Sequence, residues 1–278
     1  MTAERKMELK QLYGLDKPIV QRYFIWASNA LRGNFGESFA YKQPVSAVIG
    51  DYVWNSFRLA LTSFVLSILI AIPIGVISAT KQYSVFDGGF TVFALIGLSM
   101  PSFFFGLLLV KFFAIDLRLL PVAGMTTAAF RGTVLQESLD VLYHMVLPCM
   151  VLTMGSVGSL MRYTRTSVLE VIRQDYIRTA RAKGLKEKVV IYKHALRNAL
   201  IPIVTILGLS LPSLFGGAII TETIFVWPGI GKIALGALTE RDYPFLMGFN
   251  MFMAMLTLIG NLIADISYAF VDPRIRLK

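Results

Sequence analysis

Long apolar runs separated by short polar stretches form the main pattern along this chain. A helix of about 20 residues crosses the roughly 30 Å hydrocarbon core of a bilayer, because each residue adds about 1.5 Å. Membrane strands would instead show alternating segments of about 10 residues. The pattern therefore predicts an all-α transmembrane domain over residues 56–271. The uncharged runs that would form its spans cover residues 59–79, 89–110, 141–161, 199–221 and 245–264.

Composition supports a membrane protein and argues against other classes. Hydrophobic residues make up 55% of the 278 residues and charged residues 16%, which is too apolar for soluble domains of this length. The net charge of +10 would suit nucleic acid only as a basic face with stacking aromatics, whereas here the charges lie between apolar runs. The single cysteine, Cys149, excludes an intrachain disulfide and a Cys-based zinc site.

The most basic stretch lies between the third and fourth apolar runs. Residues 162–197 carry ten Lys and Arg against three Asp and Glu, a net charge of +7. Positively charged loops are retained on the cytoplasmic side of a membrane. We therefore place this loop and the carboxyl-terminal tail in the cytoplasm and the near-neutral loops outside. The cytoplasmic segments are 162–198 and 272–278, and the outer loops are 115–140 and 222–244.

The polar amino-terminal segment, residues 1–55, is extracytoplasmic in this arrangement. No signal peptide or apolar helix precedes it to carry it across the membrane. We expect that an additional amino-terminal span has been lost from this chain. The alternative is that Met1 is not the natural start.

The basic loop has a pattern of helix, break and helix. Good helix formers precede Gly184, which suits the left-handed residue that ends a helix, and a second amphipathic helix could lead into the fourth run. Several apolar side chains would be left in water unless a partner groove covered them. The alternative is a helix lying on anionic lipid, where each Lys or Arg adds about 1 kcal/mol of attraction. These apolar residues are Tyr176, Ile177, Ala180 and Leu185.

The spacing of Thr179-Ala180, Gly184 and His194-Ala195-Leu196 resembles the EAA loop of ABC-importer permeases. That loop inserts a short coupling helix into a cleft on the ATPase subunit. Two positions depart from the general motif, because Arg178 replaces a glutamate and Arg197 replaces a proline. Both departures are similar to the peptide and nickel branch of the family, whose version reads much like Tyr-Ile-Arg-Thr-Ala-Arg-Ala-Lys-Gly.

Segments that resemble the same branch cover nearly the whole chain. Six spans are usual in this family, with one before the region that corresponds to residues 1–55, in agreement with the expected lost span. The segments are Leu15-Asp-Lys-Pro18, Gly33-Asn-Phe-Gly-Glu-Ser38, Pro101-Ser-Phe, Glu222-Thr-Ile-Phe-Val-Trp-Pro-Gly-Ile-Gly231, Arg241-Asp-Tyr-Pro244 and Asp272-Pro-Arg274.

The resemblance implies a polytopic membrane helical bundle, the type I ABC importer transmembrane domain, in the bacterial cytoplasmic (inner) membrane. This chain would be one permease, working with a second permease subunit, two cytoplasmic ABC ATPase subunits and an extracytoplasmic solute-binding protein. The sequence contains no P-loop of the form G-x-x-x-x-G-K-[ST]. We therefore expect no enzyme activity and no cofactor in this chain, with ATP and Mg²⁺ held by the ATPase subunits. Membrane lipid is an expected partner and nucleic acid is not.

The resemblance also implies that the basic loop couples ATP hydrolysis to transport. ATPase movement would shift the helix 175–183 as a rigid lever and tilt the spans, four of which contain proline. On the outer side, residues 1–55 would be either a landing surface for the binding protein or scaffolding. The coupling residues expected from the resemblance are Tyr176, Arg178, Thr179, Ala180, Arg181, Lys183, Gly184, Leu185 and His194.

The sequence does not identify a substrate site or a metal site. Peptides are the expected cargo by family frequency, with nickel or another small solute as the alternative. No cluster of His, Cys or carboxylates in the sequence argues for nickel. Lys111, His144 and Asp265 are the ionisable residues nearest the span interiors, and each lies close enough to an interface to be hydrated.

Two other classes of membrane protein fit the sequence less well. An intramembrane serine peptidase would need His144 beside Ser156 or Ser159, but these serines lie roughly 18 and 22 Å away along one helix. A secondary transporter would show charged groups at mid-membrane and inverted repeats, which the sequence lacks. The small residues around these serines, including Gly155 and Gly158, suit close packing of two helices instead.

Overall fold

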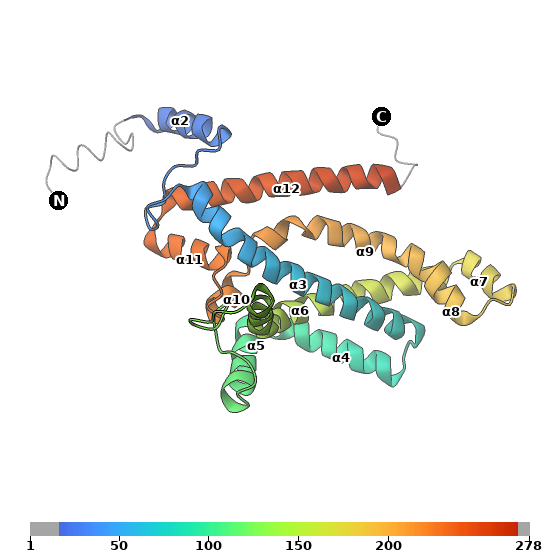
Figure 1. The fold of residues 1–278 in the computed structure, drawn as a ribbon. Coiled ribbons are helices and arrows are strands. Elements are labelled where there is room, and N and C mark those ends of the chain that lie inside the picture. The colour runs from blue at the N-terminus through green and yellow to red at the C-terminus, as the bar shows by residue number, and fades with distance from the viewer. Residues whose placement is uncertain (1–16, 272–278) are drawn as a thin grey trace. The chain divides into compact units, whose positions relative to one another are not determined.

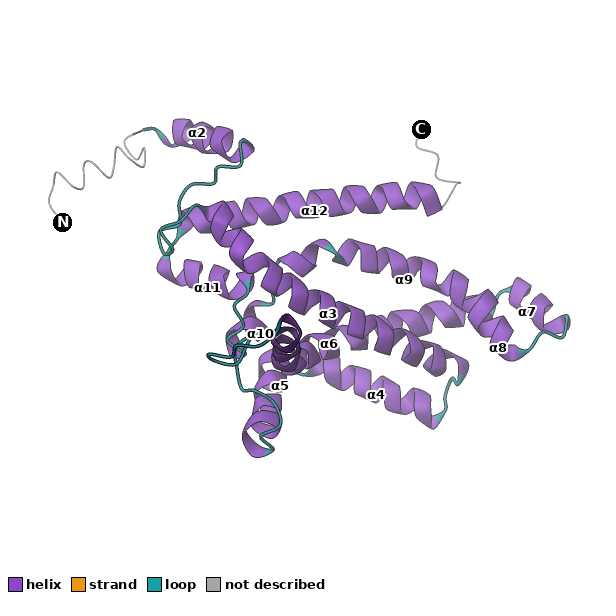
Figure 2. Cartoon of the chain, viewed as in Figure 1, coloured by secondary structure: helices purple, strands orange, loops and turns teal. Residues whose placement is uncertain are grey.

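The computed structural model describes residues 17–271, and the side chains of residues 17–262. Helices form nearly all of the regular structure in these residues (Figure 2), apart from an isolated bridge between Glu37 and Pro44. The expected all-α fold is therefore confirmed for the described part of the chain. Outside it lie Leu15 and Asp16, the tail 272–278 with its Asp272-Pro-Arg274 segment, and the side chain of Asp265.

The chain forms two compact units. The first contains the described part of Met1–Asp51 together with Ala234–Phe252. The second contains Tyr52–Ile233 and the described part of Met253–Lys278. Each unit is described by itself below, and the basic loop belongs to the second.

Four helical stretches among the described residues are long and apolar enough to cross a membrane (Figure 1). Three of them coincide with the first, third and fifth apolar runs, and each extends beyond its run at one end or both. The prediction was correct here because an unbroken uncharged run satisfies its backbone only as a helix in lipid. The stretches are α3 (Val45–Thr80), α6 (Val134–Ile172), Glu187–Phe215, and the Tyr243–Leu262 part of α12 (Tyr243–Val271).

The second apolar run does not form one straight helix, so the prediction of a single span over 89–110 needs correction. Helix α4 (Val85–Ser99) ends before Pro101, and α5 (Ser102–Leu109) continues into the π-helical segment η1 (Val110–Asp116). The two halves are bent by 103°. Met100 is extended, with φ −80° and ψ 121°, because the residue before a proline avoids the helical region.

Other prolines do not end their helices. Pro73, Pro148 and Pro202 lie inside α3, α6 and α9 (Leu196–Ser210) respectively. The fourth run nevertheless stops earlier than predicted, because the span ends at Phe215 and not at residue 221. The left-handed Gly217, with φ +75°, separates it from the short helix α10 (Ile219–Ile224).

The core of the second unit lies where α3, α4, α6 and α9 meet (Figure 1). Ala71, Ala94, Met161 and Ile203 are among its buried side chains. Small residues let the helices approach: a Cβ atom on Gly158 would lie 2.8 Å from the carbonyl oxygen of Ala94. The expected packing role is therefore confirmed for Gly158, whereas Gly155 and Ser156 lie on the exposed side of α6.

The first unit holds its amino-terminal segment with a buried carboxylate. Asp242 accepts hydrogen bonds from Ser38 Oγ at 2.5 Å and from the backbone N–H groups of Ala40 and Phe245, each at 3.2 Å. Burial raises the pKa of Asp242, but these hydrogen bonds more than offset that effect, so the pKa lies below its ordinary value. Asp242 thereby joins the loop after α2 (Ile19–Leu31) to the first turn of α12.

Candidate functional site

The basic loop of the second unit folds as a helical hairpin. Helix α6 ends at Ile172, and α7 (Asp175–Ala182) begins after a two-residue link. Gly184 follows with φ +74°, so the predicted left-handed break is confirmed. The chain then returns through α8 (Glu187–Val189) and the π-helical segment η2 (Val190–Ala195) into α9. We call α7, α8 and η2, with the turn between them, the basic hairpin.

One face of α7 is buried within the chain itself. Ile177 is fully buried and Ala180 is 8% exposed, and both pack with Val190 and Ala195 of η2. The expectation that Ile177 and Ala180 would need a partner protein to leave water is therefore wrong. The reason is that the chain after Gly184 folds back and covers them, which helix periodicity within α7 does not reveal.

The other expected coupling residues form the outer side of the basic hairpin. Tyr176 is 44% exposed and Leu185 is 41% exposed, so two of the four apolar residues expected to contact a partner remain available. His194 is only partly exposed. The exposed members of the expected set are Tyr176, Arg178, Thr179, Arg181, Lys183, Gly184 and Leu185.

Side-chain contacts make the basic hairpin a single rigid piece. The Arg181 guanidinium donates two hydrogen bonds to Glu187, at 2.7 and 3.2 Å, across the turn at Gly184. These bonds raise the pKa of Arg181 and hold it in the charged form. On the other side, Asn198 Nδ2 donates to Tyr176 Oη at 3.1 Å and links α7 to α9. A force on α7 would therefore move the whole hairpin.

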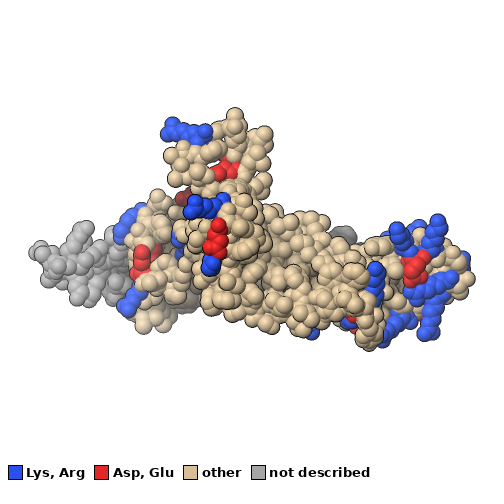
Figure 3. Space-filling view, turned by 90° about the horizontal axis from the view of Figure 1, so that it is seen from below, with Lys and Arg blue, Asp and Glu red and all other residues tan. Residues whose placement is uncertain are grey.

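Positive charge gathers on the basic hairpin and the adjoining ends of α6 and α9. Figure 3 shows the blue side chains crowded at one end of the second unit, with few red ones between them. Such a surface attracts an acidic protein or an anionic lipid head group. The exposed cations there are Arg173, Arg178, Arg181, Lys183, Lys186, Lys188, Lys193 and Arg197.

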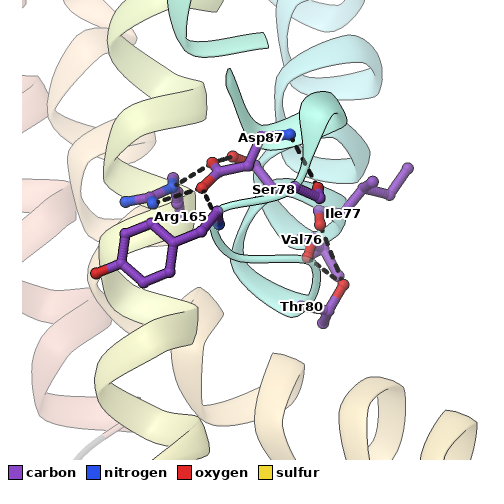
Figure 4. A network of polar contacts seen from close by, with 8 residues as sticks. Val76, Ile77, Ser78, Thr80, Asp87 and Arg165 are labelled. Carbon is purple, nitrogen blue, oxygen red and sulfur yellow. Dashed lines mark hydrogen bonds and ion pairs between the residues drawn. The ribbon is translucent and has the colours of Figure 1, made fainter. Parts of the chain in front are cut away.

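A buried ion pair that sequence reasoning missed lies near the basic hairpin (Figure 4). Asp87, in the first turn of α4, accepts hydrogen bonds from Arg165 Nε at 2.8 Å and Nη2 at 2.9 Å. It also accepts from Ser78 Oγ of α3 and, at 2.9 Å, from the Tyr83 backbone N–H. The Asp87 side chain is 6% exposed and that of Arg165 is 26% exposed. One signal for this pair was present in the sequence: Asp87 lies just before the second apolar run, and Arg165 lies just after the third.

A second buried carboxylate contacts the amino-terminal half of α3. Glu222 of α10 is fully buried and accepts hydrogen bonds from Ser56 Oγ at 2.6 Å and from the backbone N–H groups of Ala218 and Lys232, at 3.0 and 2.9 Å. Ser56 Oγ in turn accepts from the Ile230 N–H at 2.8 Å. The carboxylate and the hydroxyl thereby satisfy donors in the first turn of α11 (Ile230–Glu240).

The segment from Glu222 to Gly231 has a strained and closely packed backbone. Val226 has φ +49°, a conformation rarely adopted by a β-branched residue. The next residue, Trp227, is fully buried and donates from Nε1 to the carbonyl oxygen of Asn55 at 3.0 Å. A Cβ atom at Gly231 would lie 2.9 Å from Glu222 Oε2. This closely packed turn is therefore built around the Glu222 carboxylate.

The residues considered for catalysis or for a pathway do not form a site. His144 Nδ1 lies 2.8 Å from the carbonyl oxygen of Asp140 in its own helix, and Ser156 Oγ donates to Leu152 at 3.1 Å. Lys111 pairs with Asp116 at 2.6 Å on an exposed surface. Among residues 17–262, His, Cys, Asp and Glu side chains form no group of three that could hold a metal ion.

Comparisons with known proteins identify transport proteins over most of the chain. The family described as "Binding-protein-dependent transport system inner membrane component" matches residues 71–277. The oligopeptide transport system permease protein AppB of Bacillus subtilis is 44% identical over 274 residues, which are 98% of this chain and 85% of AppB. The dipeptide transport system permease protein DppB of Escherichia coli is 37% identical over 295 residues, covering 100% of this chain and 87% of DppB.

One further relative and one solved structure agree with this picture. The di/tripeptide transport system permease protein DppB of Pseudomonas aeruginosa is 39% identical over 277 residues, covering 95% of this chain and 82% of that protein. An inward-facing structure of the MetNI methionine ABC transporter has a chain that superimposes with a TM-score of 0.56 at 17% identity. That match covers 78% of this chain and 95% of the other, and at this identity it shows a shared fold.

Proposed function

Because this chain belongs to the family of binding-protein-dependent transport system inner membrane components, we propose that it is the permease subunit of an ATP-driven peptide importer. It is a multi-pass protein of the inner membrane, in agreement with its long apolar helices. The observation that carries the peptide assignment is the 44% identity to an oligopeptide permease over 98% of the chain. Relatives named for dipeptides and for di- and tripeptides support the same class of cargo.

The proposed assembly contains a second permease subunit, two ABC ATPase subunits and an external solute-binding protein. ATP and Mg²⁺ bind to the ATPase subunits, and this chain hydrolyses nothing itself. Support comes from the family, which depends on a binding protein, and from named relatives that are permease proteins. Peptides pass along the interface of the two permeases, driven by conformational changes in the ATPases.

The basic hairpin is the proposed contact with an ATPase, on the cytoplasmic side of the membrane. Its rigid construction suits a lever, because the Arg181–Glu187 contact joins α7 to α8 and the Tyr176–Asn198 contact joins α7 to α9. Its outer side offers Tyr176 and Leu185 for apolar contact, with Arg178 and Lys183 around them. Ala180 is not part of this surface, because it packs inside the basic hairpin against Val190 and Ala195.

An uptake experiment tests the proposed function. The complete importer, assembled with its second permease, ATPases and binding protein, is reconstituted in liposomes with ATP inside. We expect binding-protein-dependent accumulation of a radiolabelled tripeptide, competed by unlabelled peptides and abolished without ATP. Accumulation of ⁶³Ni²⁺ in place of peptide would assign the alternative cargo, and failure of any ATPase to copurify would contradict the assembly.

Replacement of Gly184 tests the role of the basic hairpin. Gly184→Ala places a Cβ atom in open space but on a residue with φ +74°, which costs about 1 kcal/mol of strain. We expect substrate-stimulated ATPase activity and uptake to fall together. The matched control is Gly208→Ala in α9, where a Cβ atom also meets nothing within 4 Å and the backbone is helical. Wild-type coupling in Gly184→Ala would contradict this role.

A further inference from the structure

The carboxylate of Asp87 joins three helices of the second unit at one point. Ser78 reaches it from α3, Arg165 reaches it from α6, and Asp87 itself belongs to the first turn of α4 (Figure 4). With the Tyr83 N–H, four donors surround its two oxygens. A bidentate arginine fixes both the distance and the orientation of its partner, which a contact between apolar side chains does not.

Arg165 stands on a rigid connection to the basic hairpin. Seven residues separate it from Ile172 at the end of α6, which is about 10 Å of helix. Residues 166–172 are helical and contain neither glycine nor proline. Across the two-residue link to α7, Val171 and Ile172 of α6 pack against the buried cluster that contains Ile177 of α7. Displacement of α7 therefore displaces the Arg165 guanidinium.

The helices α3 and α4 have no short covalent route to the basic hairpin. Helix α9 follows the hairpin directly in the chain, and Ser167 Oγ of α6 also donates to the Ala199 carbonyl oxygen at 2.7 Å. Helix α4, in contrast, meets the middle of α6 through Gly97, Ala94 and Gly158, contacts that are close but non-directional. The directional link between α4 and α6 that we find is the Asp87–Arg165 pair.

We infer that the Asp87–Arg165 ion pair is the positioning contact through which movement of the basic hairpin is passed to α4. This inference rests on the proposed function, since it concerns how ATP-driven movement reaches the membrane helices. While the pair is intact, α4 and the turn before it follow α6. Without the pair, α3 still moves with the hairpin, because Val76 and Ala79 pack with α6, α9 and Ile191 of η2, and α4 lags behind.

The first test measures peptide transported per ATP hydrolysed in the complete reconstituted importer. We expect Asp87→Asn to keep ATP hydrolysis while the ratio of peptide to ATP falls at least about fivefold, the lower end of typical coupling between two sites. Arg165→Lys, which keeps the charge and loses the bidentate geometry, should lie between wild type and Asp87→Asn. The control is Asp116→Asn, which removes an exposed ion pair with Lys111 and should leave the ratio unchanged.

A double variant separates positioning from simple stabilisation. Asp87→Asn and Arg165→Gln alone each leave one partly buried charge unpaired, whereas the two changes together leave none, so thermal stability should recover in the double variant. We expect its ratio of peptide to ATP to stay low. Recovery of the ratio together with stability would show a merely structural role and would overturn the inference.

Distance measurements give a readout that does not depend on activity. Spin labels at Val85→Cys and Glu170→Cys, both exposed, lie on α4 and α6 on either side of the pair. In otherwise wild-type importer their separation should be the same with and without ATP, and with Asp87→Asn it should change on ATP binding. If ATP changed the label separation equally in both proteins, this inference would be overturned and the proposed function would not be affected. A wild-type complex without ATP-driven uptake would refute the proposed function and this inference with it.

Discussion

Helix α3 is anchored at two points, one in its amino-terminal half and one near its carboxyl end, by the same chemical device built in two different ways. At one end Ser56 donates to the buried Glu222, and at the other Ser78 donates to the buried Asp87. Glu222 receives its other hydrogen bonds from the backbone N–H groups of Ala218 and Lys232, which carry no formal charge. Asp87 receives two of its bonds from Arg165, whose side chain is 26% exposed.

The difference indicates which anchor is fixed and which can move. The Lys232 N–H lies in the first turn of α11 and the Ala218 N–H precedes α10, so neither donor can leave Glu222 without movement of the backbone itself. The Arg165 guanidinium instead belongs to the helix that leads to the basic hairpin, so Asp87 can follow movement of α6 with its hydrogen bonds intact. We therefore regard the Glu222 end as static scaffold and the Asp87 end as the place where the packing of α3 and α4 responds to movement of α6.

Removal of the Glu222 side chain should have the largest effect. Glu222→Ala leaves the Ser56 hydroxyl and two backbone N–H groups without their acceptor in a fully buried place. We expect a loss of at least about 3 kcal/mol, because each of the three donors left without an acceptor costs about 1 to 3 kcal/mol. Thermal unfolding of the detergent-purified chain measures it. A variant as stable as wild type would refute the static-scaffold interpretation.

Serine replacements compare the two ends directly. Ser56→Ala removes a donor to Glu222 and also the acceptor for the Ile230 N–H, so we expect a cost of about 2 kcal/mol. Ser78→Ala removes one of four donors around Asp87, so about 1 kcal/mol is expected. Both serines are buried in α3, which makes each the control for the other. Equal losses would remove the distinction between the ends.

Relief of strain at Val226 should stabilise the Glu222 end slightly. Val226 is 49% exposed with φ +49°, so Val226→Gly loses little burial and removes a left-handed β-branched residue. After the entropy cost of glycine in the unfolded chain, we expect a gain of about 0.5 to 1 kcal/mol. Val189→Gly is the control, because Val189 has a helical φ of −69° and its replacement should destabilise. A lower unfolding temperature for Val226→Gly would argue against strain.

Acid should weaken the third carboxylate anchor, at Asp242. Its pKa is lower in the folded chain than in the unfolded chain, so its contribution to stability is present above the unfolded pKa and is lost as the pH falls through the folded pKa. We expect the difference in unfolding temperature between wild type and Asp242→Asn to shrink on acidification from pH 7. A constant difference over that range would show that ionisation of Asp242 is not what stabilises the first unit.

The apolar runs and the break at Gly184 could be predicted because each depends on local chemistry. An uncharged run in lipid needs a helix, and glycine favours the left-handed residue that ends one. The behaviour of proline could not be predicted in the same way. Pro101 ends a helix while Pro73 and Pro148 lie within helices, since the outcome depends on what neighbouring segments supply to the freed backbone groups.

The contacts that matter most in the candidate site were beyond sequence reasoning for a physical reason. Asp87 and Arg165 are 78 residues apart, and Ser56 and Glu222 are 166 apart, so only the packing of α3, α4, α6 and α10 brings them together. The burial of Ile177 and Ala180 likewise depends on a segment that follows the turn at Gly184. Periodicity within one helix shows that a face is apolar, and it does not show which neighbour covers that face.

The hydrogen bonds of Ser56 and Ser78 also define the length of α3 that lies between its two anchored positions. Ser56 and Ser78 are 22 residues apart, or about 33 Å along a helix, close to the thickness of a bilayer's hydrocarbon core. Because α3 is hydrogen-bonded at both of these serines, it cannot slide along its own axis to suit a thinner or thicker membrane. Hydrophobic mismatch must then be absorbed by the surrounding lipid or by the helices that lack such anchors. Acyl-chain length should therefore act on this protein through the bilayer around α3, with α3 itself unchanged.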